Sequence, residues 1–281
     1  MAPREKTWKW RSAQALSNAL DRAERLLGAR FYDLHLAAAA LRHRKGKNLV
    51  NVTVGQQVIT FRAPTARALW RAETLLTKEP ATIRWIDSFR SQDIFWDVGA
   101  NIGIYSLYAA KIKNIATLAF EPAAFNYALL CDNVRLNGSD DRLRAYCIAF
   151  SSRSHLGELF AADDEPGAAI ASIEEVVGAI RQGVLAFSID DFVRYFNPLF
   201  PTHIKIDVDG IEDQILEGSA VTLANPKLRS LLIEVDERRA ELPVQIDAYL
   251  KRYGLELMQV EGSPLAPRSA SRNRIYWRQA I

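Results

Sequence analysis

The chain has 281 residues, of which 49% are hydrophobic and 25% charged, a composition typical of a globular protein with a substantial buried core. No stretch approaches the roughly 18 consecutive apolar residues of a transmembrane helix, and the N-terminus lacks the apolar segment and cleavage site of a secretory signal. Two cysteines, Cys131 and Cys147, argue against a disulfide framework and make a poor zinc site. We therefore expect a cytoplasmic protein whose two thiols are small buried side chains.

The net charge of +3 is unevenly distributed along the chain. Residues 1–48 carry eleven Lys or Arg and four Asp or Glu, a balance of +7, so the remainder is mildly acidic. Leucines recur in this segment at helical spacing, which predicts one or two amphipathic helices. These helices are interpreted either as a solvated cap on the main domain or as a contact with an anionic membrane surface or glycolipid. No interleaving of basic and aromatic side chains supports RNA binding.

The next residues predict a hairpin and then helices. Residues 47–64 alternate apolar and polar side chains around Gly55, which is typical of a β-hairpin. Residues 65–90 have apolar side chains at helical spacing, interrupted by Pro80. We place a boundary near residue 90 and predict two parts, a basic extension of helices and a hairpin at 1–90 and an α/β domain at 91–281.

From residue 93, short apolar strands alternate with helices, which indicates a parallel sheet covered on both faces. The expected strands are 93–99, 115–122, 143–150, 203–210, 230–236, 255–262 and 274–279. The expected helices are 105–113, 123–137, 211–224 and 244–253. Residues 151–200 break the alternation, and we expect loops, a short helix and an extra strand near 184–193. Loops at the carboxyl ends of parallel strands hold the ligands of such folds.

The first of these strands ends in the sequence DVGANIG, residues 97–103. Gly99 and Gly103 permit a tight turn before a helix, so we expect backbone amides to converge above the strand tip. The three-glycine spacing of a dinucleotide fingerprint is missing, and Asp97 places a carboxylate where a pyrophosphate would lie. A cationic, amino-bearing ligand such as S-adenosylmethionine suits that carboxylate better.

The second strand carries another acid at its tip. Glu121 lies 18 residues after Gly103 and is followed by Pro122, which ends the strand. An acid in this place can accept both hydrogen bonds of a ribose diol. The two acids occur in the right order, which favours a nucleoside-type ligand over the alternative that both merely cap helices.

The segments DVGANIGIYSLYAA, AFEPAAFNYALLCDNVRLN, SIDDFV, HIKIDVDGIEDQILEGSAVTL and LLIEVDE resemble the FkbM family of S-adenosylmethionine-dependent methyltransferases, over about residues 93–240. The resemblance implies a class I methyltransferase domain, a Rossmann-like, doubly wound sheet of about seven strands that is mostly parallel with one antiparallel strand. It also implies that the first acid and its turn contact the methionine end of the cofactor and that the second acid holds the ribose. The implied residues are Asp97, Gly99, Ala100, Asn101, Gly103, Glu121 and Pro122, with Asn126 a further candidate at the ribose. The chain departs from the family in having Asp209 where Glu is usual, and in a loose match at residues 147–159.

The stretch IKIDVDGIE, residues 204–212, is the best candidate for catalysis. Alternation along the strand puts Lys205, Asp207 and Asp209 on one side. Glu212 follows one turn into the next helix. Four ionisable side chains at one strand end are costly to bury without a function, although an internal salt-bridge network is the alternative.

These four residues receive different predicted roles. Asp207 is predicted to touch the acceptor or orient the donor, and it counts among the cofactor-binding residues as well. Asp209 or Glu212 is predicted to be a general base or a metal ligand, and Lys205 to neutralise the cluster or bind an anionic acceptor. A hydroxyl acceptor has a pKa far above neutrality, so a carboxylate base or a metal would assist. A divalent metal is chemically compatible with these carboxylates, but spacing alone does not predict one.

Some neighbouring side chains are ambiguous. His203 is interpreted as structural, although it could face the acceptor. Glu234 and Asp236 at the next strand tip lie either in the acceptor pocket or in a solvated loop. Trp96 is interpreted as a core residue that could also wall the cofactor pocket.

Together these patterns predict a cytoplasmic S-adenosylmethionine-dependent methyltransferase. The resemblance favours O-methylation of a hydroxyl on a sugar, glycolipid or natural product, so we expect a small-molecule or glycan acceptor and no nucleic acid. The basic extension would suit an anionic or membrane-linked acceptor. Two alternatives remain: a nicotinamide-dependent oxidoreductase, and a non-catalytic RNA- or membrane-binding protein that keeps the fold.

Overall fold

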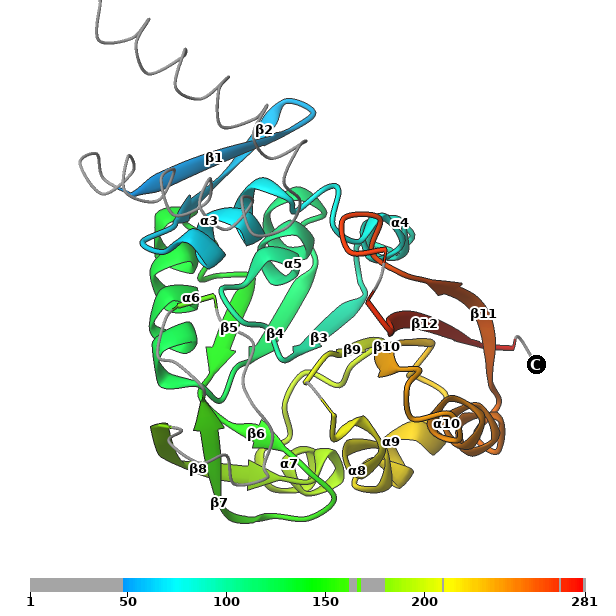
Figure 1. Ribbon diagram of the computed structural model, residues 1–281. Coiled ribbons are helices and arrows are strands. Elements are labelled where there is room, and N and C mark those ends of the chain that lie inside the picture. The colour runs from blue at the N-terminus through cyan, green and yellow to red at the C-terminus, as the bar shows by residue number, and fades with distance from the viewer. Residues whose placement is uncertain (1–47, 162–165, 168–179, 209, 268, 280–281) are drawn as a thin grey trace, which may run out of the picture.

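A seven-stranded sheet forms the centre of the computed structural model (Figure 1). The structure describes residues 48–161, 166–167, 180–208, 210–267 and 269–279, so the helices predicted for residues 1–47 lie outside the described residues. The strand order is β11-β12-β10-β9-β3-β4-β5. The strands are β3 (Ile94–Val98), β4 (Ala116–Phe120), β5 (Leu143–Tyr146), β9 (His203–Ile206), β10 (Ser230–Asp236), β11 (Leu255–Glu261) and β12 (Ser271–Arg278).

All neighbouring pairs from β10 to β5 are parallel, whereas β12 runs antiparallel to both of its neighbours. The predicted sheet of seven strands with one antiparallel strand is therefore confirmed. Its central strands are mostly apolar and almost entirely buried because helices cover both of their faces.

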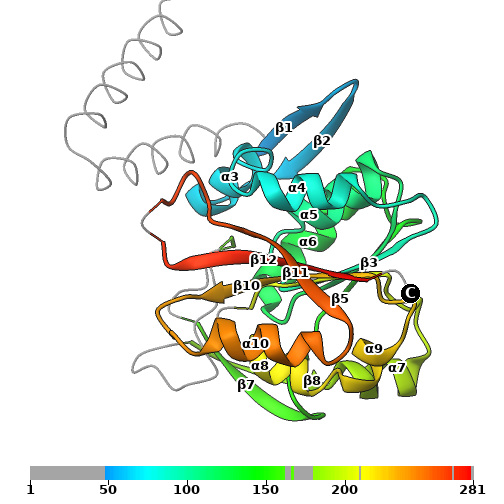
Figure 2. The ribbon, with the colours of Figure 1, turned by 90° about the vertical axis from the view of Figure 1, so that its right-hand side faces the viewer.

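Two hydrophobic cores lie on opposite faces of the sheet (Figure 2). The helices of one face are α3 (Ala66–Glu73), α4 (Pro80–Asp87), α5 (Ile104–Leu107) and α6 (Ala124–Leu136). Those of the other face are α7 (Ile189–Phe196), α8 (Glu212–Glu217), α9 (Ala220–Ala224) and α10 (Leu242–Lys251). Among the described residues, no helix combines the length and apolar composition needed to cross a membrane.

The predicted hairpin is present and packs on the first face. Its strands, joined through a turn at Gly55, are β1 (Leu49–Val54) and β2 (Gln57–Arg62). Asn133 of α6 accepts a hydrogen bond from the Arg62 amide at 2.7 Å. Asn137 accepts from the Thr60 amide at 2.9 Å and donates to the Thr60 carbonyl at 2.7 Å. These amide side chains form hydrogen bonds with the backbone groups at the edge of β2, which would otherwise be unpaired.

The hairpin, α3 and α4 contribute to the same hydrophobic core as α5 and α6. The segment 48–90 thus packs against the sheet directly, and the division at residue 90 stays a prediction about domain organisation. Pro80 begins α4 instead of interrupting a helix, because proline has no N–H to lose at a first helical position.

Several element boundaries differ from those predicted. The strand expected at 143–150 leaves the main sheet after Tyr146, and its end, β6 (Ala149–Phe150), joins a separate three-stranded sheet. The other strands of that sheet are β7 (His155–Ala161), which was not predicted, and β8 (Ile180–Phe187). Cys147 lies in the break between the sheets and is exposed, and Cys131 is half-buried, so the expectation of two buried thiols was wrong.

Two predicted helices are also interrupted. Residues 105–113 become α5 followed by a π-helical segment, Tyr108–Ile112. Residues 211–224 divide into α8 and α9 at Gly218, where a Cβ atom would stand 2.4 Å from the carbonyl oxygen of Ser151. Close backbone packing at that point, which the sequence does not reveal, explains the break.

A buried hydrogen-bonded chain joins the amino ends of three strands, at the edge opposite the predicted site. The Trp85 indole donates to the Ser230 hydroxyl at 2.8 Å, and Ser230 lies 2.6 Å from Nδ1 of His203. Nε2 of His203 lies 3.0 Å from Asp93, which also accepts from Arg229 at 2.9 Å. Burial lowers the pKa of His203, and a neutral ring satisfies every donor in this chain. His203 is therefore structural.

We expect Asp93→Asn to lower the melting temperature at pH 7 by roughly 5 to 10 °C. Burial alone would raise the pKa of Asp93, but hydrogen bonds from His203 and the Arg90 amide, with the charge of Arg229, lower it to about 2. This stabilisation is complete above the unfolded pKa of about 4 and is lost as the pH falls through 2. The difference between variant and wild type should shrink over that range in thermal melts. Exposed Asp141→Asn is the control and should melt like wild type.

Candidate active site

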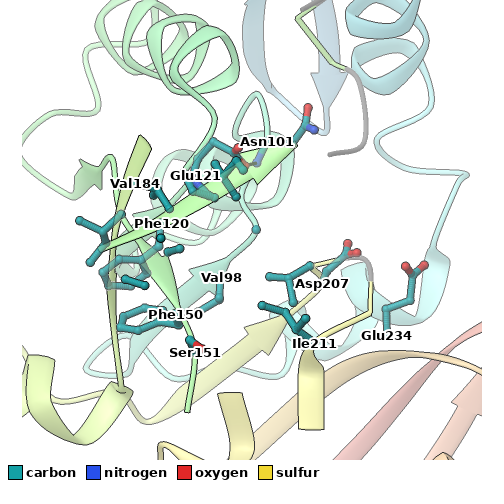
Figure 3. Close-up of a pocket in the computed structure, with 18 of the residues that line it drawn as sticks. Val98, Asn101, Phe120, Glu121, Phe150, Ser151, Val184, Asp207, Ile211 and Glu234 are labelled. Atoms are coloured by element: carbon teal, nitrogen blue, oxygen red, sulfur yellow. Dashed lines mark hydrogen bonds between the residues drawn. The ribbon is translucent and has the colours of Figure 1, made fainter. Parts of the chain in front are cut away.

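The carboxyl ends of the central strands open into a cavity of about 260 Å³ (Figure 3). Its walls come from the turns after β3, β4, β5 and β9, from β7, β8 and β10, and from the N-terminal extension. The lining includes Arg71, Lys78, Gly99, Asn101, Glu121, Pro122, Ile148, Phe150, Val184, Asp207 and Glu234. The expectation that the site lies at this edge of the sheet agrees with the position of the cavity.

The turn after β3 depends on its two glycines. Gly99 has φ +79°, and a Cβ atom there would stand 1.8 Å from the carbonyl oxygen of Asp207. Gly103 has φ +84°, and its Cβ would stand 2.3 Å from a methyl group of Leu130. Any side chain at Gly99 would push β3 and β9 apart, so this glycine sets the distance between the two acid-bearing strand tips.

The amide groups of this turn are used inside the protein. The amides of residues 99 and 100 donate to the Phe120 carbonyl, at 2.9 and 3.0 Å, and that of residue 101 donates to Glu121 at 2.7 Å. Those of residues 102 and 103 bond within the turn, at 3.0 and 2.8 Å. The amides of residues 99 to 103 therefore have acceptors inside the protein, and a pyrophosphate would have to compete with these bonds to use them.

Glu121 is buried with its carboxyl group at the cavity wall. It accepts hydrogen bonds from the amides of Asn101, at 2.7 Å, and Ala123, at 3.0 Å, and from the side chain of Asn126. Burial raises the pKa of Glu121 to about 7, and these hydrogen bonds counteract part of that rise. These hydrogen bonds hold the carboxylate in one orientation. Of the other residues predicted here, Asn126 is buried and is not one of the described lining residues, and Pro122 is part of the cavity lining.

Asp97 lies behind the cavity wall. It is 1% exposed, and its Oδ2 accepts a hydrogen bond from the Ser106 hydroxyl at 2.5 Å. Its Oδ1 is buried without a hydrogen-bond donor among the described residues and lies 4.0 Å from Nζ of Lys205. Burial raises the pKa of Asp97, and the positive charge of Lys205 opposes the rise. An acceptor atom of this kind suits an ammonium group or its bound water.

Lys205 and Asp207 form a buried ion pair. Lys205 is 1% exposed, its Nζ lies 2.6 Å from Oδ2 of Asp207, and it lies 5.3 Å above the ring of Tyr105. Burial would raise the pKa of Asp207, but Lys205 and Lys78 outweigh it and lower the pKa below its ordinary range. Lys205 thus neutralises the acidic cluster from below, while Asp207 faces the cavity.

Glu234 lies beside Asp207 at the tip of the adjacent strand, and both carboxyl groups point to the same side (Figure 3). The negative charge of Asp207, followed by burial, raises the pKa of Glu234 to about 9. An ionised Asp207 favours the protonated form of Glu234, because two adjacent carboxylates repel each other.

The remaining predicted catalytic residues lie elsewhere. Glu212 is 3% exposed at the start of α8 and accepts from the Gly210 amide at 3.1 Å, and burial raises its pKa to about 7. It is not among the described residues that line the cavity. Asp209 lies outside the described residues. Within the described part of the chain, no three His, Cys, Asp or Glu side chains are placed to hold a metal ion.

The structure also settles the ambiguous side chains. Asp236 lies at the surface, ion-paired with Arg238, whereas Glu234 lines the cavity. Trp96 lies in the core on the α7 side, where its indole donates to the Leu199 carbonyl at 3.0 Å. The sequence did contain a signal that Glu234 belongs to the site, because Glu234 follows the apolar part of its strand just as Asp207 follows β9. The extension gave no comparable signal for Arg71 and Lys78, whose places depend on how α3 and α4 pack.

The sheet order, the single antiparallel strand and the acids at the first two strand tips define a class I methyltransferase fold. The METTL16 methyltransferase domain shares this fold, with a TM-score of 0.51 at 12% identity and coverage of 88% of this chain and 92% of that chain.

Residues 97–257 match the model of the methyltransferase FkbM domain, and the chain therefore belongs to the FkbM methyltransferase family. It is similar to the hexuronic acid methyltransferase AglP of Haloferax volcanii, with 26% identity over 177 residues, 62% of this chain and 69% of that protein. It is also similar to the methyltransferase sdnD of Sordaria araneosa, with 27% identity over 202 residues, 61% of this chain and 77% of that protein.

The residues present fit S-adenosylmethionine, the methyl donor of this class. The carboxylate of Glu121 at the cavity wall suits the two ribose hydroxyls, whereas Asp97 is not among the described residues that line the cavity. Apolar side chains of Phe120, Ile148 and Phe150 offer the cavity a surface for an adenine ring.

We expect Glu121→Gln to weaken binding of S-adenosylmethionine about 10- to 100-fold, because an amide is a weaker acceptor than a carboxylate for the ribose hydroxyls. Since the pKa of Glu121 is about 7, wild-type affinity should rise as the pH increases from 6 to 8 and the acid ionises. Calorimetric titration at several pH values would measure both effects. A variant with unchanged affinity and pH dependence would contradict the assignment. Glu217→Gln, at an exposed position of α8 that is not among the described lining residues, is the matched control.

Proposed function

We propose that the protein transfers a methyl group from S-adenosylmethionine to a hydroxyl oxygen of a sugar, glycolipid or natural-product acceptor. The observation that carries this proposal is the pair of carboxyl groups, Asp207 and Glu234, that lie on adjacent strands at the cavity wall. A hydroxyl gives up its proton only to a well-placed base, because its pKa lies far above neutrality. An amine acceptor would have less need of such a pair.

When bound, S-adenosylmethionine supplies a methyl group on a positively charged sulfur, so the protein has mainly to align the acceptor and remove its proton. In the proposed mechanism Asp207, kept ionised by Lys205, accepts a hydrogen bond from the acceptor hydroxyl. Glu234 in its ionised form takes up the proton, which the two carboxyl groups then share. With a pKa of about 9, Glu234 is a stronger base than an ordinary carboxylate.

Three further observations support this function. A relative at 26% identity is named a hexuronic acid methyltransferase, and the sugar class of its substrate agrees with the acceptor proposed here. The amides of the glycine turn are occupied within the protein, which disfavours the nicotinamide-dependent oxidoreductase. The intact acids at the first strand tips disfavour the non-catalytic alternative. Contact of the basic segment 1–47 with an anionic glycolipid is part of the proposal, and binding to anionic vesicles would test it.

The function itself is tested by incubating the purified protein with S-adenosylmethionine and a panel of glycans, including some with uronic acids. We expect a mass increase of one methyl group on an acceptor, and fragmentation should locate it on oxygen. Methylation of an amine, or an absence of cofactor binding at millimolar concentration, would contradict the proposal.

We expect kcat/KM to rise with pH and to level off above about 9, as Glu234 ionises. Glu234→Gln should lower kcat by about 10²- to 10⁴-fold and remove this rise, because glutamine cannot take up a proton. Asp236→Asn, two residues further along β10 and at the surface, should leave the profile unchanged. Retention of the alkaline rise in Glu234→Gln would show that another group is the base.

A further inference from the structure

We propose that Arg71 is a carboxylate-binding residue of this cavity, so that α3 of the N-terminal extension is part of the site. The proposal rests on the methyltransferase function argued above. Neither the sequence patterns nor the family match, which begins at residue 97, includes this arginine.

Among the described residues, the guanidinium of Arg71 is oriented by a hydrogen bond but has no ion-pair partner. Arg71 lies in the last turn of α3, is half-buried and lines the cavity. Its Nε donates to the Gly167 carbonyl at 2.7 Å, which fixes the plane of the group. Within the described residues no carboxylate forms an ion pair with Arg71, whereas the other lining cation of the extension, Lys78, pairs with Glu79. The two terminal nitrogens of Arg71 therefore keep their hydrogen-bonding capacity.

A chain of hydrogen bonds places this arginine beside the acid assigned to the ribose. The Thr65 hydroxyl donates to the Pro166 carbonyl at 2.5 Å, and the Gly167 amide donates to Asn126 at 2.8 Å. Asn126 is in turn hydrogen-bonded to Glu121. The peptide at residues 166 and 167 thus fixes α3 and Glu121 relative to each other, and the positive charge of Arg71 acts on the carboxyl group of Glu121.

Arginine in this setting is suited to a carboxylate. Its planar group offers two parallel N–H donors, which match the two oxygens of a carboxylate. A partly buried cation without a counter-ion gains most from such a ligand, because little water is displaced from it. Two ligands of the proposed reaction can bring this group: the amino-acid end of S-adenosylmethionine, or an acceptor that is itself a carboxylic acid, such as a uronic acid.

The first experiment compares the full-length wild type with Arg71→Gln by calorimetric titration. The ligands are S-adenosylmethionine and decarboxylated S-adenosylmethionine, which lacks only the carboxylate. If Arg71 holds the donor, the wild type should prefer S-adenosylmethionine by about 10- to 100-fold and Arg71→Gln should lose that preference. Arg67→Gln, an exposed position on the same helix, should behave like wild type. Thermal melts of all three proteins verify that they are folded.

The second experiment uses a uronic-acid glycan and its methyl ester as acceptors in the same calorimeter. If Arg71 holds the acceptor, the wild type should prefer the free acid by a similar factor, and Arg71→Gln should bind both equally. Loss of carboxylate preference in either arm supports the proposal and identifies the ligand. The proposal is overturned if the wild type binds S-adenosylmethionine and a folded Arg71→Gln keeps the wild-type preference for the carboxylate form of both ligands. A wild type that binds no S-adenosylmethionine overturns the proposed function and this inference together.

Discussion

The active edge of the sheet depends on one buried cation. Lys205 lies between Asp97 and Asp207, and its charge makes it possible for two carboxyl groups to occupy neighbouring strand tips. Because Lys205 holds Asp207 in its ionised form, the negative charge of Asp207 in turn keeps a proton on Glu234. Removing one partner of a buried ion pair leaves the other charge uncompensated, which costs about 3 to 5 kcal/mol. Stability and the protonation of the site therefore depend on the same residues.

The glycine turn after β3 influences which ligand can bind, because its backbone amides donate to acceptors inside the protein. In a phosphate-binding turn the amides point at the ligand, but here the end of β4 and the carboxylate of Glu121 accept them. The turn therefore presents side-chain acceptors to the cavity in place of backbone donors. The carboxylate of Glu121 suits ribose hydroxyls, and the occupied turn amides do not suit a pyrophosphate. This difference separates a methyltransferase from a dinucleotide-dependent enzyme that has a similar sheet.

The cavity is completed by segments outside the central sheet. The sheet formed by β6, β7 and β8 supplies one wall, and α3 with the turn before α4 supplies Arg71 and Lys78. The strand tips that line the cavity are mostly acidic, so its cationic side chains come from these segments, and Lys78 is paired with Glu79. The extension thus shares a hydrophobic core with the domain and also contributes to the charge of its ligand site.

The sequence by itself determined the class of fold and the acids at the first two strand tips. Alternating apolar strands and helices are local patterns, and parallel strands bring their carboxyl ends to one edge, so Asp97, Glu121 and Asp207 could be assigned to that edge. Only the tertiary structure decided that Glu234 lies beside Asp207, that Glu212 accepts a hydrogen bond from the Gly210 amide outside the cavity lining, and that Arg71 reaches the cavity. The order of strands, the burial of a side chain and the docking of a distant helix depend on residues far apart in the sequence. A residue's charge state depends on these features in turn. For the same reason the strand at 143–150 was wrong in its second half, since its pairing partner, β8, lies more than thirty residues further along the chain.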